Sequence, residues 1–434
     1  MRDLLPVLSG WYAAHAPFGL ATVVAVSRSA PRDPGAAMAV GPDDEVVGSV
    51  SGGCVEGAVF ELAREVVASG EARLETFGYS DEDAFAVGLT CGGEITVLVR
   101  PVTPELDPTF GAVARSVAAG EPVTVATVVD GPAGRGATLA VWPEGVGGGG
   151  GDLGGAGGGG GAFGGRGASD AFGAVGTPGT PGNPDTSGTP DTSNTLSTSS
   201  TPGVSDIPGT LGTLGSTGLD VAVTADARGE LALGATGLRH YGPCGERRED
   251  SVSVFLHSFA PPPRMLVFGA IDYAAAVARI GDFLGYRVTV CDARPVFATP
   301  KRFPAGVEVV VDWPHRYLHG TDTDERTVIC VLTHDPKFDV PLLEEALRRP
   351  AAYIGAMGSR RTHDDRMRRL LESGLSEGEL GRLRSPVGLD LGARTPEEVA
   401  VSVAAEIVAL RWGGTGMPLT GAAGAIHRGS APRG

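Results

Sequence analysis

The last third of the chain alternates short, continuously apolar segments with helical segments, and few folds can accommodate that pattern. The apolar segments have the length of strands and lie at 265–268, 287–291, 307–311, 327–332 and 352–355. The helical patterns lie at 273–284, 340–347, 361–371 and 395–410. Strands that are apolar on both faces and alternate with helices predict a parallel sheet covered on both sides. We therefore expect residues 263–412 to form a doubly wound, Rossmann-type α/β domain.

Residues 1–143 mix helical and strand patterns and predict a smaller α+β domain. The predicted strands are 21–26, 46–50, 95–99 and 137–141, and the predicted helices are 3–15 and about 55–68. Gly70 is placed to end the second helix. Residues 219–262 are expected to complete this region with strands. The first of these is predicted at 219–223, followed by a turn at 226–229.

The segment 144–218 is rich first in glycine and then in Thr, Pro, Ser and Gly, and it accounts for many of the 68 glycines of the chain. It has few large apolar side chains, so it cannot bury enough surface to offset its ordering entropy, and we expect it to be disordered. Because strand patterns flank it, we interpret it as an insertion in a strand-to-strand connection. The entropic cost of closing such a loop grows only with the logarithm of its length. The tail 413–434 is also expected to be disordered.

Composition excludes several classes of function. The formal net charge of -16 argues against binding to nucleic acid or to an anionic membrane. The start of the chain lacks the pattern of a secretory signal, and no apolar run approaches the ~18 residues needed to span a bilayer. The five cysteines are scattered, odd in number and never at C-x-x-C spacing, which favours reduced thiols in the cytoplasm over disulfides or a structural zinc site.

Two loops combine a cysteine with a Gly-Gly pair. The first is Ser51-Gly52-Gly53-Cys54, which leads from a strand into a helix. Small residues at a helix start expose N–H groups that favour an anion, and a thiol in the first helical turn has a lowered pKa. The second is Cys91-Gly92-Gly93 before the strand 95–99. The two loops together indicate one shared site with two thiols, although small buried cysteines in tight turns would give the same pattern.

The loop after the first strand of the α/β domain is the usual place for a dinucleotide. The dinucleotide fingerprint requires three glycines there, but only Gly269 is present, since Ile271 and Ala274 occupy the other two positions. Asp272 adds a negative charge where phosphates would lie. Asp292 ends the second strand, where an acid that binds ribose belongs. NAD(P) binding and a plain strand-to-helix turn both remain open, with NAD(P) the less favoured.

Other polar loops are expected at the same edge of the sheet. In the segment Gly358-Ser359-Arg360, together with Arg361, the hydroxyl and the guanidinium groups are suited to a phosphate, although a solvated basic helix start is the alternative. Thr333-His334-Asp335 predicts either acid–base chemistry or a capped helix start. The glycine-bracketed loop 388–394 contains Asp390 and precedes a predicted helix with Thr395 as N-cap and Glu398 completing a capping box.

Taken together and in this order, the segments 48–56, 88–93, 358–360 and 388–396 resemble the XdhC/CoxI family. Its members are accessory proteins of molybdenum hydroxylases such as xanthine and carbon monoxide dehydrogenases. The resemblance implies an N-terminal domain with the cysteine loops and a C-terminal Rossmann domain. It covers both ordered parts of the chain. Members often carry Gly-x-Gly-His at the Rossmann loop, from which Ile271 and Asp272 depart.

The resemblance implies that the chain binds the molybdenum cofactor, as molybdopterin or its dinucleotide form, assists its sulfuration and delivers it to an apo-hydroxylase. Thiolate is a soft ligand, so Cys54 or Cys91 would ligate molybdenum or pass sulfur. A cysteine desulfurase or a cofactor-synthesis protein is a further expected partner, and a homodimer remains open. We expect a cofactor chaperone without catalysis. The alternatives are an NAD(P)-dependent oxidoreductase and a thiol-based sulfur-transfer enzyme.

Overall fold

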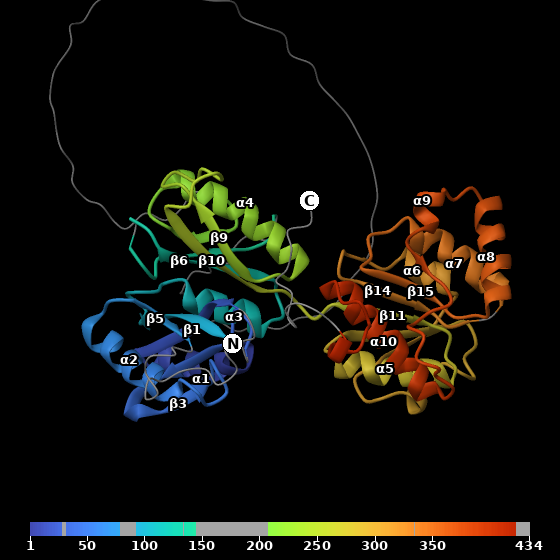
Figure 1. Cartoon of the computed structure of the whole chain (residues 1–434), viewed down its shortest axis with the longest axis horizontal. Coiled ribbons are helices and arrows are strands. Elements are labelled where there is room, and N and C mark those ends of the chain that lie inside the picture. Colours follow the sequence, from blue (N-terminus) through green and yellow to red (C-terminus); the bar gives the residue numbers. More distant parts are fainter. Residues whose placement is uncertain (28–31, 79–92, 133, 145–206, 334, 422–434) are drawn as a thin grey trace, which may run out of the picture. The chain divides into compact units, whose positions relative to one another are not determined.

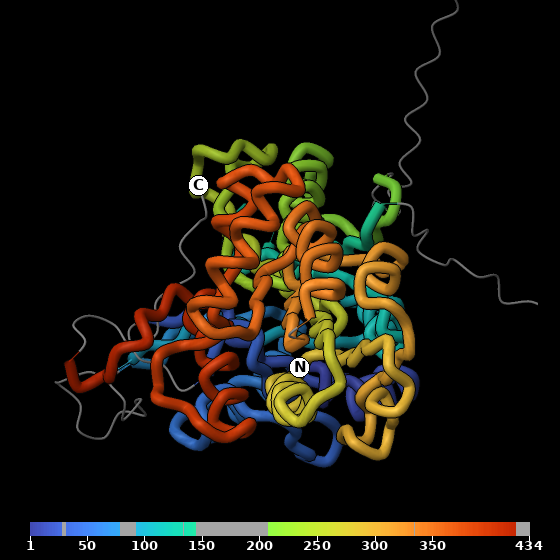
Figure 2. Tube along the Cα trace, turned by 90° about the vertical axis from the view of Figure 1, so that its right-hand side faces the viewer, coloured from blue at the N-terminus to red at the C-terminus, as the bar shows by residue number. Residues whose placement is uncertain are grey.

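The structure is a computed structural model that describes residues 1–27, 32–78, 93–132, 134–144, 207–333 and 335–421. The remaining segments are drawn in grey (Figure 1, Figure 2) and lie outside this description. They include most of the predicted insertion, the end of the predicted tail and the predicted site residues Cys91 and Gly92.

A first antiparallel sheet is formed near the N-terminus, in the order β3-β2-β1-β5-β4. Its strands are β1 (Phe18–Ser27), β2 (Ala37–Val40), β3 (Val46–Gly48), β4 (Arg73–Phe77) and β5 (Glu94–Val102). Helix α2 (Glu56–Ser69) packs on this sheet through Val59, Ala63 and Val66 and ends at Gly70, whose φ of 73° is left-handed as predicted. A short 3-10 turn η1 (Arg2–Leu4) and helix α1 (Leu5–Ala13) precede the sheet, and η2 (Pro42–Asp44) joins β2 to β3.

A second antiparallel sheet follows helix α3 (Phe110–Ala118) and has the order β8-β7-β6-β10-β9. Its strands are β6 (Val123–Asp130), β7 (Thr138–Val141), β8 (Thr210–Gly212), β9 (Gly237–Tyr241) and β10 (Val252–Phe259). Residues Val24 and Leu98 of the first sheet share a buried cluster with Val129 and Phe255 of the second. Figure 1 shows α2 beside β1 and β5, and helix α4 beside the strands of the second sheet.

The predicted strand at 219–223 and the turn at 226–229 are wrong, because the structure has one helix there, α4 (Thr217–Leu233). The alternation of Leu219, Val221 and Val223 resembles a strand, but Leu219, Val223, Ala227 and Leu231 are buried with helical spacing. The Ser216 hydroxyl caps the helix by accepting from the N–H of Leu219, and Gly234 ends it with a φ of 62°. Strands β9 and β10 supply the strands that were predicted for the rest of 219–262.

The predicted boundary of the insertion at residue 218 is also wrong, because β8 and the start of α4 lie before it. Strand β8 pairs directly with β7 in the antiparallel sense. The segment between them therefore lies in a strand-to-strand connection, although its second strand is β8 and not the strand predicted at 219–223. The expected disorder of 144–218 falls largely on residues outside the described ranges.

The C-terminal domain has a six-stranded, entirely parallel sheet in the order β13-β12-β11-β14-β15-β16, which confirms the predicted Rossmann-like fold. Its strands are β11 (Arg264–Phe268), β12 (Arg287–Asp292), β13 (Glu308–Val311), β14 (Val328–Val331), β15 (Tyr353–Ala356) and β16 (Leu383–Arg384). The order reverses between β11 and β14, and in doubly wound sheets the ligand crevice lies at that point, outside the carboxyl ends of the strands.

Helices cover both faces of this sheet (Figure 1). Helices α5 (Asp272–Phe283) and α10 (Pro396–Trp412) contribute to one buried cluster, and α6 (Pro314–His319), α7 (Pro336–Leu347), α8 (Arg360–Glu372) and α9 (Glu377–Leu380) to the other. The predicted capping box of α10, with Thr395 and Glu398, is present. The short 3-10 turn η3 (Pro300–Arg302) lies between β12 and β13. In the predicted tail, residues 413–421 are described and end in η4 (Leu419–Gly421).

Within the described ranges, no helix is both long enough and apolar enough to cross a membrane.

Candidate functional site

The loop between β3 and α2 is organised around one carboxylate, that of Glu56. It accepts hydrogen bonds from the hydroxyls of Ser49 at 2.7 Å and Ser51 at 2.5 Å. It also accepts from the backbone N–H groups of Ser51, Gly52, Gly53 and Val55, at 2.9, 3.0, 2.8 and 3.2 Å. A single side chain thus satisfies the donors that the turn into the helix would otherwise leave open.

These hydrogen bonds stabilise the charged form of Glu56. Partial burial disfavours the carboxylate, but donation from Ser51 and Ser49 outweighs that effect and lowers the pKa of Glu56 to about 2. The prediction that the N–H groups of this loop are open to an external anion is therefore corrected, because the chain's own carboxylate already binds them. The sequence motif contains Glu56, but the pattern alone assigns it no role.

Cys54 lies in this loop, half-buried, with its N–H donating to the Ser51 hydroxyl at 3.0 Å. It was predicted in the first turn of the helix, but α2 begins at Glu56, two residues later. Gly52 and Gly53 have φ values of 80° and 119°, and a Cβ on either would meet no atom of the described residues within 4 Å. The glycines are thus required by backbone conformation, and no described side chain fills the space beside them.

The other cysteines of the described ranges differ from Cys54 in their surroundings. Cys291 and Cys330 are buried in β12 and β14, and burial raises the pKa of each thiol to about 12. Such thiols are unreactive at neutral pH. Cys244 is exposed in the loop between β9 and β10. Gly93 is buried just before β5, while Cys91 and Gly92 lie outside the described residues, so the predicted two-thiol site stays a prediction.

At the carboxyl edge of the parallel sheet, Gly269 makes the turn after β11. Its φ is 103°, and a Cβ there would lie 2.9 Å from the Thr333 methyl group, so only glycine fits. The carboxylate of Asp292 accepts from the Ala270 N–H at 2.7 Å and from the Arg294 guanidinium at 2.8 and 2.9 Å. Burial opposes ionisation of Asp292, but these donors keep its pKa below the usual value. This carboxylate is therefore engaged inside the protein and does not face the crevice as an unpaired acid that would bind ribose.

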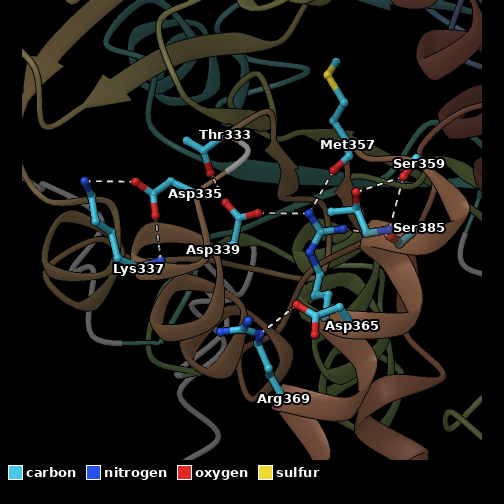
Figure 3. Close-up of polar contacts among 11 residues, drawn as sticks. Thr333, Asp335, Lys337, Asp339, Met357, Ser359, Asp365, Arg369 and Ser385 are labelled. Carbon is cyan, nitrogen blue, oxygen red and sulfur yellow. Dashed lines mark hydrogen bonds and ion pairs between the residues drawn. The ribbon is translucent and has the colours of Figure 1, made fainter.

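A buried ion pair holds together the loops that follow β14, β15 and β16 (Figure 3). The guanidinium of Arg366 on α8 lies 2.9 Å from the carboxylate of Asp339 on α7. Arg366 also donates to the carbonyl of Met357 at 2.8 Å and to the hydroxyl of Ser385 at 3.0 Å. The hydroxyl of Thr333 donates to Asp339. Sequence reasoning missed Asp339, Arg366 and Ser385, although charged residues inside otherwise amphipathic helices are a signal worth following.

Ser359, Arg360 and Arg361 occupy the start of α8, as predicted. The Ser359 hydroxyl caps the helix by accepting from the N–H of Thr362 at 3.2 Å. Both arginine side chains are exposed at the surface of the domain. The geometry allows them to meet a phosphate, but a phosphate-binding role for this segment stays a prediction.

The loop 388–395 lies along helix α10 and is held by three polar residues on one side of that helix. Glu406 accepts from the N–H of Gly388 at 2.9 Å and from the hydroxyl of Tyr353 at 2.5 Å. The Ser402 hydroxyl donates to the Leu389 carbonyl at 2.5 Å. Glu398 accepts from the N–H groups of Arg394 and Thr395 at 2.7 and 3.1 Å. Spacing of four residues places all three on one face, and the loop they hold presents Asp390 to solvent.

The segment 333–335 begins a helix, which was one of its two predicted interpretations. Asp335 caps α7 by accepting from the N–H of Lys337 and forms an ion pair of 2.9 Å with the Lys337 ammonium. His334 lies outside the described residues. No group of three or more His, Cys, Asp or Glu side chains in the described part of the chain is arranged to hold a metal ion.

Family models match a segment of the N-terminal part and most of the C-terminal domain. A model described as the XdhC Rossmann domain matches residues 265–407, and one described as the XdhC and CoxI family matches residues 11–78. Over these two regions the chain resembles the XdhC and CoxI family. The first matched segment includes Arg366 with its partners and the loop held by α10, and the second includes the loop braced by Glu56. In the sequence, the second antiparallel sheet lies between the two matched segments.

Two curated proteins resemble this chain over part of its length. The chain is 31% identical over 163 residues to a Bacillus subtilis protein named as a probable component of xanthine dehydrogenase, a match that covers 38% of this chain and 47% of that protein. It is 31% identical over 169 residues to the molybdenum cofactor insertion chaperone PaoD of Escherichia coli, a match that covers 39% of this chain and 46% of that protein. The matched regions span less than half of each relative.

A solved structure shares the fold of this chain. It is a crystal structure described as a xanthine dehydrogenase from Bacillus halodurans, with a TM-score of 0.58 over 94% of this chain and 95% of that chain. Its sequence identity of 23% supports a common fold.

Proposed function

We propose that this protein is an accessory factor that binds the molybdenum cofactor and inserts it into a molybdenum hydroxylase. The observation that carries the proposal is the loop 51–54, in which a half-buried cysteine lies beside two open glycines on a frame braced by Glu56. A thiolate is a soft ligand suited to molybdenum. The relative named as an insertion chaperone gives this chemistry its context.

The C-terminal domain is proposed to hold the phosphate end of the same cargo. Ser359 and Arg360 at the start of α8 and Asp390 in the loop on α10 lie at the carboxyl edge, where α/β domains bind ligands. The cargo carries one phosphate as molybdopterin or a pyrophosphate as a dinucleotide, and two exposed guanidinium groups suit either form. Gly269 and Asp292 shape this edge from within.

Help with sulfuration is the finer part of the proposal. Among the described cysteines, Cys54 combines partial exposure with an open loop, so it is the proposed site for receiving sulfur as well as for binding metal. An apo-hydroxylase is the proposed recipient. A desulfurase partner and a homodimer stay predictions. An NAD(P)-dependent oxidoreductase is less favoured, since Asp292 is bound by Arg294 and the loop at 269–274 lacks two glycines.

Cofactor retention tests the proposal. The purified full chain is mixed with isolated molybdenum cofactor and desalted, and the retained pterin and molybdenum are quantified for wild type, Cys54→Ala and Cys244→Ala. We expect wild type and Cys244→Ala to retain both and Cys54→Ala to lose molybdenum. Addition of the loaded protein to an apo-hydroxylase should restore its activity. Absence of retained pterin together with tight NAD(H) binding would show that the oxidoreductase alternative is correct.

A further inference from the structure

The two antiparallel sheets of the N-terminal part are built to one plan. Each has three strands, then a helix, then two strands, and each has the same spatial order, β3-β2-β1-β5-β4 in the first and β8-β7-β6-β10-β9 in the second. Every strand pair is antiparallel in both. Helix α2 packs on β1 and β5, and α4 packs on the equivalent strands β6 and β10.

The correspondence extends to single residues. Residues 46–77 align with 210–241 without a gap, so that β3 falls on β8, α2 on α4, and β4 on β9. Both helices end at an equivalent left-handed glycine, Gly70 and Gly234. Equivalent apolar residues are all buried, namely Val50/Leu214, Val55/Leu219, Val59/Val223 and Ala63/Ala227. Shared topology, register and burial indicate a duplicated unit.

A carboxylate at the start of the helix is common to both units. Glu56 aligns with Asp220, and Asp220 accepts from the Thr213 hydroxyl at 2.8 Å and from the Leu214 N–H at 2.7 Å. Thr213 aligns with Ser49, whose hydroxyl donates to Glu56. Because the second unit keeps this arrangement without the Gly-Gly-Cys sequence, the carboxylate serves to brace the turn that enters the helix.

The two units differ in the residues that lie between the strand, β3 or β8, and the bracing carboxylate. Gly52, Gly53 and Cys54 align with Ser216, Thr217 and Gly218. In the second unit the turn is filled, since a Cβ on Gly218 would lie 2.4 Å from the carbonyl oxygen of Cys244. In the first unit, a Cβ on Gly52 or Gly53 would meet nothing within 4 Å among the residues that the structure describes.

We infer that the N-terminal part is a tandem duplication in which only the first unit carries the thiol loop, and that Glu56 is the positioning residue of Cys54. The Glu56 carboxylate holds the N–H groups on both sides of the cysteine, at Gly53 and Val55, and thereby sets the course of the backbone through it. This inference rests on the proposed role of Cys54 in binding cargo. It adds the group that shapes the loop and assigns Asp220 as its structural counterpart.

The test compares Glu56→Ala, Glu56→Gln and Glu56→Asp with Asp220→Asn in the full chain. Alkylation of Cys54 by iodoacetamide at one fixed pH is followed by mass spectrometry of its peptide, with the exposed Cys244 as an internal reference. Thermal unfolding of each variant is measured in parallel. Loss of charge-assisted hydrogen bonds should change the Cys54 rate by about tenfold in Glu56→Ala and Glu56→Gln. Glu56→Asp should restore the wild-type rate, because aspartate braces the equivalent turn at position 220.

The matched control separates positioning from general stability. Asp220→Asn should lower the unfolding temperature while leaving the Cys54 rate and cofactor retention as in wild type. A Cys54 rate that is unchanged in folded Glu56→Gln, or that changes equally in Asp220→Asn, would overturn the inference. If wild type retains no cofactor, the proposed function fails, but the alkylation rates still decide whether Glu56 positions Cys54.

Discussion

The guanidinium of Arg366 and the carboxylate of Asp339 form a 2.9 Å ion pair in which the two side chains are 3% and 4% exposed. Together with Met357 and Ser385, the pair connects the loops that follow three neighbouring strands. Removing one member leaves an uncompensated buried charge, which costs about 3–5 kcal/mol.

Arg366→Ala should therefore lower the free energy of unfolding of the C-terminal domain by about 3–5 kcal/mol. The measurement is urea denaturation followed by circular dichroism. Arg368→Ala, two positions along the same helix, is the control, because Arg368 pairs with Asp365 and Glu372 at the surface. Equal denaturation midpoints for the two variants would show that the Arg366 pair contributes nothing.

The depressed pKa of Glu56 predicts acid sensitivity of the thiol loop. A free glutamate titrates near 4.5, whereas hydrogen bonds lower the pKa of Glu56 to about 2 in the folded protein. The unfolded chain therefore takes up this proton at a higher pH than the folded one. The contribution of Glu56 to the free energy of unfolding is present above about pH 4.5 and is lost as the pH falls towards 2.

The experiment is the difference between wild type and Glu56→Gln in unfolding free energy, measured from pH 7 to pH 2. Taking the difference cancels the other carboxyl groups. The advantage of wild type should be constant down to about pH 4.5 and shrink below it. A difference that is flat over the whole range would contradict the hydrogen-bonded state of this carboxylate.

Much of the C-terminal domain follows from pattern alone, while its polar network does not. Five of its six strands and four of its helices were predicted because continuous apolar runs and capped helices are local signals, as with Thr395 and Glu398. Asp339 and Arg366 are 27 positions apart in the sequence, so nothing local reveals that they meet. The loops were located correctly, and the residues that fix their shape were not.

The N-terminal part shows why α4 and the duplication were missed. The sequence of α4 begins with Leu219, Val221 and Val223, whose alternation mimics a strand. The insertion interrupts the second unit between β7 and β8, so the sequence does not show a continuous repeat of the first unit. Residues identical between the units, such as Gly48/Gly212 and Arg64/Arg228, are a minority of the aligned positions. The shared strand order made the repeat evident.

Because the loop 388–395 lies close to α10, a single methyl group added to this loop is predicted to destabilise the protein. Gly388 has a φ of 97°, and a Cβ there would lie 2.4 Å from the Ser402 hydroxyl oxygen. Gly388→Ala should cost about 2–4 kcal/mol from the strained conformation and the overpacking together. Gly392→Ala is the control, since its φ is 70° but no described atom lies within 4 Å of the added group.

Thermal unfolding and cofactor retention are measured for both glycine variants. We expect Gly388→Ala to lower the unfolding temperature and to retain less cofactor, because the loop can no longer lie on Ser402 and Glu406. Gly392→Ala should show only the smaller conformational cost, about 1 kcal/mol. Equal losses in the two variants would mean that contact with α10 does not set the position of the loop.

The duplicated architecture predicts that the segment between β7 and β8 is dispensable for folding. In the first unit, η2 joins β2 to β3, and the N–H of Gly41 donates to the carbonyl of Glu45 at 2.9 Å. The second unit closes in the same way, with the N–H of Trp142 donating to the carbonyl of Gly209 at 2.9 Å. The pairing of β7 with β8 thus uses only residues that the structure describes.

A variant in which an Asn-Gly turn joins Glu144 directly to Ile207 should therefore fold with an unfolding temperature no lower than that of the full chain. The measurement is calorimetry, with circular dichroism to verify strand content. A matched deletion that also removes β8, by joining Glu144 to Thr213, should lose stability, because β7 then loses its pairing with β8 and keeps only its pairing with β6. If both deletions unfold at the same reduced temperature, the segment takes part in the core, and the second unit does not close as the first one does.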